Sequence, residues 1–150
     1  MAGGEKIGEN NGGKPAVLFI CRRNAGRSQM AEGLMRAHFG EVCSVYSAGL
    51  QPSKLSGNAI RVMQEIGIDI SSQQSKDISQ LPCNNFAAVV ILDGRLGVPS
   101  SISTGKIISM DIPDPASLKG TEEDIIAGFR SVRDQINESL LSSFKEFPFY

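Results

Sequence analysis

Several residue types that commonly build functional sites are scarce in this sequence. It contains one histidine, no tryptophan and only three cysteines among 150 residues. No cluster of His and Cys has the spacing of metal ligands, so we expect no metal ion and no other cofactor. An odd, small number of cysteines does not form a disulfide framework and is typical of reduced thiols in the cytoplasm.

Two further absences limit the possible partners. The formal net charge is only −1, so the chain lacks the excess of positive charge that favours binding to nucleic acid or to an anionic membrane. It also lacks any run of 18 apolar residues, so we expect no transmembrane helix. The composition therefore predicts a cytoplasmic protein with no nucleic acid or membrane partner, and we expect a monomer.

The length and composition predict a single domain. A hydrophobic fraction of 41% in 150 residues can supply one core. Residues 1–14 are rich in Gly and Asn, carry mixed charge and contain no apolar segment of the kind found in signal peptides. We expect a disordered tail over residues 1–14 and one catalytic domain over residues 15–150.

Strand and helix patterns alternate along this domain. Buried strands are predicted over residues 16–21, 42–48, 86–92 and 106–111, and helices over residues 28–39, 58–66 and from 121 onwards. This alternation indicates an α/β fold in which helices cover both faces of a parallel sheet. In such folds the functional site lies beyond the carboxyl ends of the strands.

The most informative segment runs from Cys21 to Ser28, where the first strand pattern gives way to the first helix pattern. A strand that turns directly into a helix N-terminus leaves several backbone N–H groups around one point. Such a position favours the thiolate form of a cysteine. Arg27 follows six residues after Cys21, and a planar guanidinium pairs well with two oxygens of an oxyanion. The segment therefore predicts a cysteine nucleophile facing a tetrahedral oxyanion.

Other residues of the segment are suited to shaping this loop. Ser28 can cap the helix or hydrogen bond to the sulfur of Cys21. Asn24 tolerates a left-handed backbone conformation, and Gly26 permits close approach of the backbone. The residues expected to bind the oxyanion or shape the loop are Arg22, Arg23, Asn24, Ala25, Gly26 and Ser28.

The pattern Cys-x2-Asn-x2-Arg-Ser over Cys21–Ser28, followed by Gln-Met-Ala-Glu, resembles the low-molecular-weight protein tyrosine phosphatase superfamily. That superfamily includes the thioredoxin-coupled arsenate reductases. The resemblance continues through residues 46–49, 65–71 and 113–115, and covers about residues 15–145. It implies a three-layer sandwich with a four-stranded parallel sheet and flanking helices.

The resemblance also implies roles for individual residues. Cys21 is similar to the nucleophile, Arg27 to the phosphate-binding arginine and Asp114 to the general acid. Ser47 is similar to a member of the polar network that stabilises the thiolate. Prolines on both sides of Asp114 fit its implied role, because a proton donor must be held in place. In a phosphatase it would protonate the leaving oxygen and then activate water against the phosphocysteine.

Some positions of this chain resemble the phosphatase branch of the superfamily, and others resemble the reductase branch. Reductases of this type carry a resolving cysteine at the end of the third strand, where this chain has Asp93. This difference favours a phosphatase. Residues 27–33 and 114–123 look more like the reductases, and Ala116 and Ser117 stand where tyrosine phosphatases usually carry aromatic residues.

The remaining cysteines leave the redox chemistry open. Cys43 lies in a strand pattern and is expected to be a buried small hydrophobe. Cys83 lies in a loop and is a less favoured candidate for a resolving thiol. Because Gly26 occupies the position of a second loop cysteine found in many of these phosphatases, we expect Cys21 to oxidise without an intramolecular partner.

The sequence therefore predicts a cysteine-dependent phosphomonoester hydrolase that works through a phosphocysteine intermediate. The alternative is an arsenate reductase that uses the same loop and an external thiol donor such as thioredoxin. A third hypothesis is an oxyanion-binding module without turnover. The expected ligand is accordingly phosphate, arsenate or a phosphoester.

Overall fold

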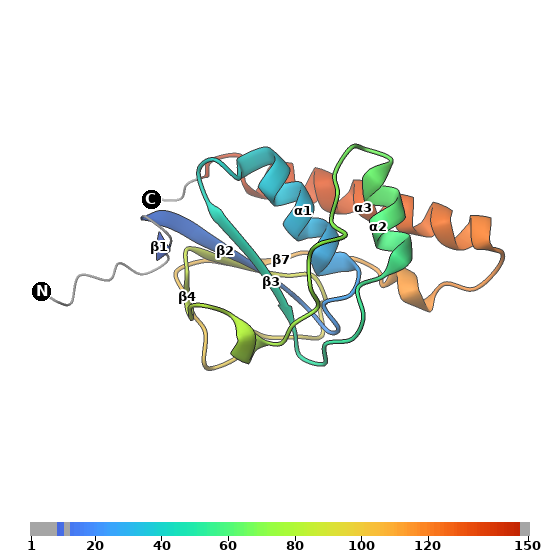
Figure 1. Cartoon of the computed structure of the whole chain (residues 1–150). Helices are drawn as coiled ribbons and strands as arrows, with labels where there is room; N and C mark the ends of the chain where they lie inside the picture. The colour runs from blue at the N-terminus through green and yellow to red at the C-terminus, as the bar shows by residue number, and fades with distance from the viewer. Residues whose placement is uncertain (1–8, 11–12, 148–150) are drawn as a thin grey trace, which may run out of the picture.

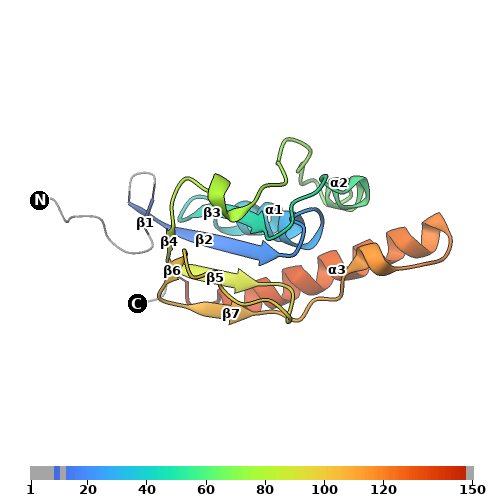
Figure 2. The same cartoon turned by 90° about the horizontal axis from the view of Figure 1, so that it is seen from below.

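The computed structural model describes residues 9–10 and 13–147, and its centre is a four-stranded parallel sheet. The spatial order of the strands is β3 (Ser44–Gly49), β2 (Lys14–Cys21), β5 (Ala88–Ile91) and β7 (Ile107–Ser109). The predicted α/β fold with this sheet is confirmed (Figure 2).

A short strand precedes the sheet. β1 (Glu9–Asn10) pairs antiparallel with the beginning of β2. The tail predicted over residues 1–14 otherwise lies mostly outside the described residues. Within the described part, pairing with β2 already begins at residue 9.

β2 is apolar from Ala16 onwards because both of its faces are covered there. Alternate side chains of a strand point to opposite faces. Val17 and Phe19 therefore belong to one core, and Leu18 and Ile20 to a second core on the other face. All four side chains are fully buried.

Three α-helices cover the first of these faces (Figure 1). They are α1 (Arg27–Phe39), α2 (Gly57–Gln64) and α3 (Glu122–Ser143). Each of these helices begins within two residues of the start predicted from the sequence. α3 begins with a capping box, in which the Thr121 side chain accepts from the N–H of Asp124 and the Asp124 side chain accepts from the N–H of Thr121. Within the described residues, no helix is both long and apolar enough to span a membrane.

The second face carries a helix, as predicted, but a short one. It is covered by the 3₁₀ helix η1 (Ile78–Gln80), by the strand pair β4 (Asn85–Phe86) and β6 (Ser103–Thr104), and by loops. The reason is local: the segment has no long apolar repeat of helical period, and Pro82 and Pro99 interrupt it. A third layer is present, but one helical turn and loops build it.

Candidate active site

The loop between β2 and α1 is held so that its N–H groups face inward. The carbonyls of Arg22 and Arg23 accept from the backbone N–H groups of Gln51 and Ser53, at 2.8 and 3.2 Å. The carbonyl of Ala25 accepts from the N–H of Ser56 at 2.9 Å. In a trans peptide the N–H points away from the C=O, so the following N–H groups point toward the centre of the loop. α1 starts at Gly26 without a side-chain cap, which leaves its first N–H groups available to an anion.

Cys21 lies at the bottom of this loop and is only 2% exposed. Its Sγ lies 2.8 Å from Ser28 Oγ and accepts from the Asn24 N–H at 3.3 Å. Ser28 therefore contacts the sulfur, one of its two predicted roles, and does not cap the helix. The Ser28 hydroxyl and the Asn24 N–H therefore both contact the sulfur of Cys21.

Asn24 fixes the shape of the loop. It has a φ of 52°, the left-handed conformation expected of it. Its Nδ2 donates to Ser28 at 2.8 Å, and its Oδ1 accepts from the Lys76 N–H at 2.9 Å and from Gln29 Nε2 at 3.0 Å. The side chain therefore joins both ends of the loop to the segment before η1.

Arg27 reaches across the site from the first turn of α1. Its Nη1 donates to the Ile112 carbonyl at 3.0 Å, and its Nη2 donates to Asp93 Oδ2 at 3.4 Å. The same Nη2 lies 3.8 Å from Asp114 Oδ2. The structure thus brings together, from three distant parts of the sequence, the residues predicted at the carboxyl ends of the strands.

Asp114 faces the loop from the segment after β7. Its Oδ1 accepts from the Ala116 N–H at 3.0 Å and caps the 3₁₀ helix η2 (Pro115–Ser117). Oδ2 remains on the side of Arg27, and the side chain is 42% exposed. A carboxyl group with one fixed oxygen and one oxygen turned toward the site is suited to proton transfer.

These residues surround a small cavity. The loop from Cys21 to Arg27 forms one wall, and the facing residues are Ser56, Asp114, Pro115, Ala116 and Phe129. The cavity volume is about 50 Å³. Because one water molecule needs about 10–15 Å³ of cavity, there is room for about four groups of that size, as in one tetrahedral oxyanion.

Asp93 lies just after the end of β5, next to Arg27. Arg95 donates to both of its carboxylate oxygens, at 3.0 and 2.9 Å, and these hydrogen bonds hold the pKa of Asp93 well below its usual range. The carboxylate is therefore charged at neutral pH and buried against Arg27. Asp93 thus holds the guanidinium of Arg27 in place.

Ser47 differs from its implied position in the thiolate network. It donates to Glu32 Oε1 at 2.5 Å, on α1. Glu32 also pairs with Arg36 at 2.8 Å and lies 3.8 Å from Lys76 Nζ. Ser47 therefore belongs to a buried charge cluster behind the loop, because β3 meets α1 at that point.

Sequence reasoning missed several supporting residues. Gln29 is fully buried and donates to the Asn24 and Gln74 carbonyls at 2.9 Å. In the sequence, this role of Gln29 is marked only by its position. It is a polar residue directly after the loop, on the helix face that packs into the core. Lys76 gave no local signal, because its partners Asn24 and Glu32 lie in other segments. Arg95 lies only two residues after its partner Asp93 and was missed although the pair is local.

The other two cysteines lie at the opposite end of the sheet from Cys21. Cys43 immediately precedes β3, whose first residue pairs with Ala16, whereas Cys21 pairs with Gly49 at the far end. At about 3.3 Å per residue this places Cys43 about 20 Å away. Burial raises the pKa of the Cys43 thiol to about 11.

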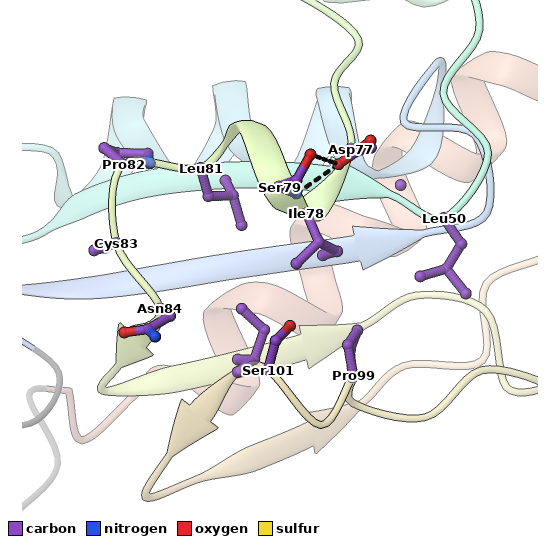
Figure 3. Close-up of a pocket in the computed structure, with 12 residues that line it drawn as sticks. Leu50, Asp77, Ile78, Ser79, Leu81, Pro82, Cys83, Asn84, Pro99 and Ser101 are labelled. Carbon is purple, nitrogen blue, oxygen red and sulfur yellow. Dashed lines mark hydrogen bonds between the residues drawn. The ribbon is translucent and has the colours of Figure 1, made fainter.

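Cys83 precedes β4, on the second face of the sheet. It borders a hollow of about 870 Å³ between η1 and the loop around Pro99. Figure 3 shows Cys83 toward the beginning of the pale blue β2 arrow, with Leu50 near the arrowhead. The separation of Cys43 from Cys21 is well beyond the Cα separation of about 7 Å that a disulfide allows.

Comparison with known proteins agrees with this geometry. The model of the family described as low molecular weight phosphotyrosine protein phosphatase matches residues 16–106. An arsenate reductase of Bacillus subtilis is 41% identical over 133 residues, which cover 87% of this chain and 93% of that protein. An arsenate reductase of Halalkalibacterium halodurans is 39% identical over 129 residues, covering 85% and 93%.

Solved structures show the same similarity. A structure described as an arsenate reductase in the phosphate binding state matches with a TM-score of 0.75 and 30% identity, covering 87% of this chain and 97% of that one. A tyrosine phosphatase of Erwinia amylovora matches with a TM-score of 0.71 over 97% of both chains. At 16% identity, the second match establishes the fold alone.

Proposed function

The chain belongs to the low molecular weight phosphotyrosine protein phosphatase family, and we propose that it is an arsenate reductase that takes its electrons from an external thiol. The observation that carries this proposal is the 39–41% identity to proteins named arsenate reductase, over 93% of their length. The small cavity supports it, because its volume of about 50 Å³ suits one oxyanion and the residues that follow Asp114 along the chain, Pro115 and Ala116, are not aromatic.

This proposal reverses the order of the two hypotheses drawn from the sequence. Asp93 favoured a phosphatase because it replaces a cysteine. Its ion pair with Arg27 fits either chemistry, so the replacement argues only against an internal resolving thiol. The phosphomonoesterase becomes the second candidate, supported by the position of Asp114 beside Arg27.

The first step forms a sulfur–arsenic bond. The Cys21 thiolate attacks arsenic in arsenate, held by the loop N–H groups and Arg27, and one arsenate oxygen leaves as water. Asp114 is the group positioned to supply a proton to that oxygen. Arsenic is still As(V) in the resulting Cys21 adduct.

The second step reduces arsenic. An external thiolate attacks Sγ of Cys21, a sulfur–sulfur bond forms, and the sulfur–arsenic electron pair stays on arsenic, which leaves as arsenite. A second thiol then releases Cys21 from the mixed disulfide. The balance is one arsenate and two thiols consumed, and one arsenite, one disulfide and one water produced. Because Cys43 and Cys83 lie at the other end of the sheet, neither can replace the external thiol.

A side-by-side assay of the full chain tests the proposal. We expect arsenite to form from arsenate in the presence of excess 2-mercaptoethanol, with a kcat/KM about 100-fold above that for hydrolysis of p-nitrophenyl phosphate. Cys21→Ser should lower both activities by about 10³-fold or more.

Two other outcomes of this assay would assign the protein to one of the other two hypotheses. Preferred hydrolysis of the aryl phosphate would make the protein a phosphatase. Binding of arsenate or phosphate by calorimetry, with neither activity, would make it an oxyanion-binding module.

A further inference from the structure

Two arginines at the active site differ from most others in the chain. Of the eight arginines in the sequence, five contact a carboxylate within the described residues: Arg27, Arg36, Arg95, Arg130 and Arg133. Arg22 and Arg23 are exposed, and the described part of the chain contains no ion pair to either guanidinium. Two adjacent cations without a counterion form the most strongly charged feature at the mouth of the site.

Their backbone is nevertheless rigid. The Arg22 carbonyl is held by Gln51, and the Arg23 carbonyl accepts both from Ser53 N–H and from Ser75 Oγ at 2.9 Å. Both residues line the same cavity as Cys21. A fixed backbone limits the region that the two side chains can reach, and this lowers the cost of binding an anion there.

The oxyanion substrate does not need these two side chains. Within the cavity it has the loop N–H groups and Arg27, which are closer to the sulfur. The second reactant, the thiol, must reach Cys21 through the same mouth, because the sulfur is buried on every other side. A cavity of about 50 Å³ admits a small molecule, whereas a cysteine fixed on the surface of a folded protein would have to enter past the Asp114–Ala116 segment.

We propose that Arg22 and Arg23 form a carboxylate-binding subsite for the reductant, and that this reductant is an anionic low-molecular-weight thiol. The inference rests on the proposed function, since it names the thiol that performs the second step. With its carboxylate on the two guanidinium groups, the thiolate attacks Sγ of Cys21, and arsenite leaves with the electron pair of the broken bond. A second molecule of the thiol restores Cys21 by disulfide exchange.

A series of thiols of different charge tests the subsite. The probes are 3-mercaptopropionate, 2-mercaptoethanol and cysteamine, compared by kcat/KM per thiolate at saturating arsenate. We expect the carboxylate thiol to exceed the neutral thiol by about tenfold at low salt, and cysteamine to be the slowest, with the differences shrinking at high salt. Equal values for the three thiols would overturn the subsite.

Substitutions locate the effect on the two arginines. In Arg22→Gln and Arg23→Gln the ratio of the carboxylate thiol to the neutral thiol should fall by about threefold each, and lysine at either position should retain most of it. The ratio is the readout because a loss of arsenate binding lowers both rates equally. Arg61→Gln is the matched control, since Arg61 is also exposed but lies on α2 away from this cavity. A ratio unchanged in both loop variants would contradict the proposal.

The same comparison can be made without arsenate. Cys21 is first converted to its mixed disulfide with 2-mercaptoethanol, and its release by each thiol is then measured. A preference for the carboxylate thiol here supports the subsite even if no arsenite forms, so the failure of the two proposals can be told apart. Release by thioredoxin much faster than by 3-mercaptopropionate would assign the reductant to the proteins and overturn the inference.

Discussion

Gly49 lies at the end of β3, directly behind the loop that joins β2 to α1. A Cβ at this position would lie 2.7 Å from the Asn24 nitrogen and 2.8 Å from both the Arg22 oxygen and the Arg23 carbonyl carbon. These are backbone atoms, which cannot rotate away as a side chain can. Glycine is required here because a strand and a loop approach each other at backbone distance.

We therefore expect Gly49→Ala to displace the loop and to lower kcat/KM for arsenate by about 10²-fold, the cost of a shift of about 1 Å in a reacting group. Steady-state kinetics and calorimetric binding of phosphate would measure the effect. Gly57→Ala is the control, because nothing lies within 4 Å of its added Cβ, and it should keep wild-type turnover. Full activity in the Gly49 variant would show that the loop is not confined from behind.

Single residues were predictable where their partners are close in sequence. The spacing of Cys21, Asn24, Arg27 and Ser28 predicted one loop, and the structure shows their mutual contacts. Partners distant in sequence were not predictable, because nothing local marks them. The hydrogen bond from Ser47 to Glu32 exists only because β3 packs beside α1.

At the scale of elements, α2 and α3 are joined by a group of charges at the end of α2. Glu65 accepts from Nε and Nη2 of Arg130 at 2.9 and 2.7 Å, and from Arg133 at 3.1 Å. Arg133 also donates to the Val62 carbonyl at 2.8 Å. The hydrogen bonds from Arg130 lower the pKa of Glu65 from 4.5 to about 2.

The ion pairs of Glu65 with Arg130 and Arg133 contribute to the stability of the folded state, and this contribution can be measured. Because the pKa of Glu65 is lower in the folded state, its contribution is present above pH 4.5 and is lost as the pH falls toward 2. Glu65→Gln should lower the melting temperature by a few degrees at pH 7, and the difference from wild type should vanish by about pH 2. Thermal unfolding across this range would measure it, with Glu138→Gln on the exposed face of α3 as control. A difference that persists at pH 2 would refute the electrostatic origin.

Elements with a clear period were predictable, and the cover of the second face was not. The helix predicted from residue 121 onwards is α3, whose apolar repeat packs Phe129, Ile136 and Leu140 into the core. The second face depends on isolated apolar residues such as Ile78 and Ile102, which meet only after the chain has folded. A turn of 3₁₀ helix leaves too few residues for a periodic signal.

At the scale of the whole molecule, the parallel sheet separates the three cysteines. The carboxyl ends of the strands carry Cys21 with Asp93 and Asp114 nearby, and the amino ends carry Cys43 and Cys83. A parallel topology keeps these ends a full strand length apart, so no rotation of side chains can bring Cys21 together with either of the other thiols. The proposed arsenate reduction therefore depends on an external thiol.

The double variant Cys43→Ala with Cys83→Ser tests this arrangement. We expect arsenate reduction with 2-mercaptoethanol to stay within about twofold of wild type, since neither thiol reaches the adduct on Cys21. When the thiol is limiting, mass spectrometry of the wild-type protein should find Cys21 carrying the external thiol as a mixed disulfide. Circular dichroism would confirm that the variant is folded, because Cys43 is buried. A dominant disulfide between Cys21 and either other cysteine, or loss of turnover in a folded double variant, would mean that the sheet opens during the reaction and that the chain supplies its own resolving thiol.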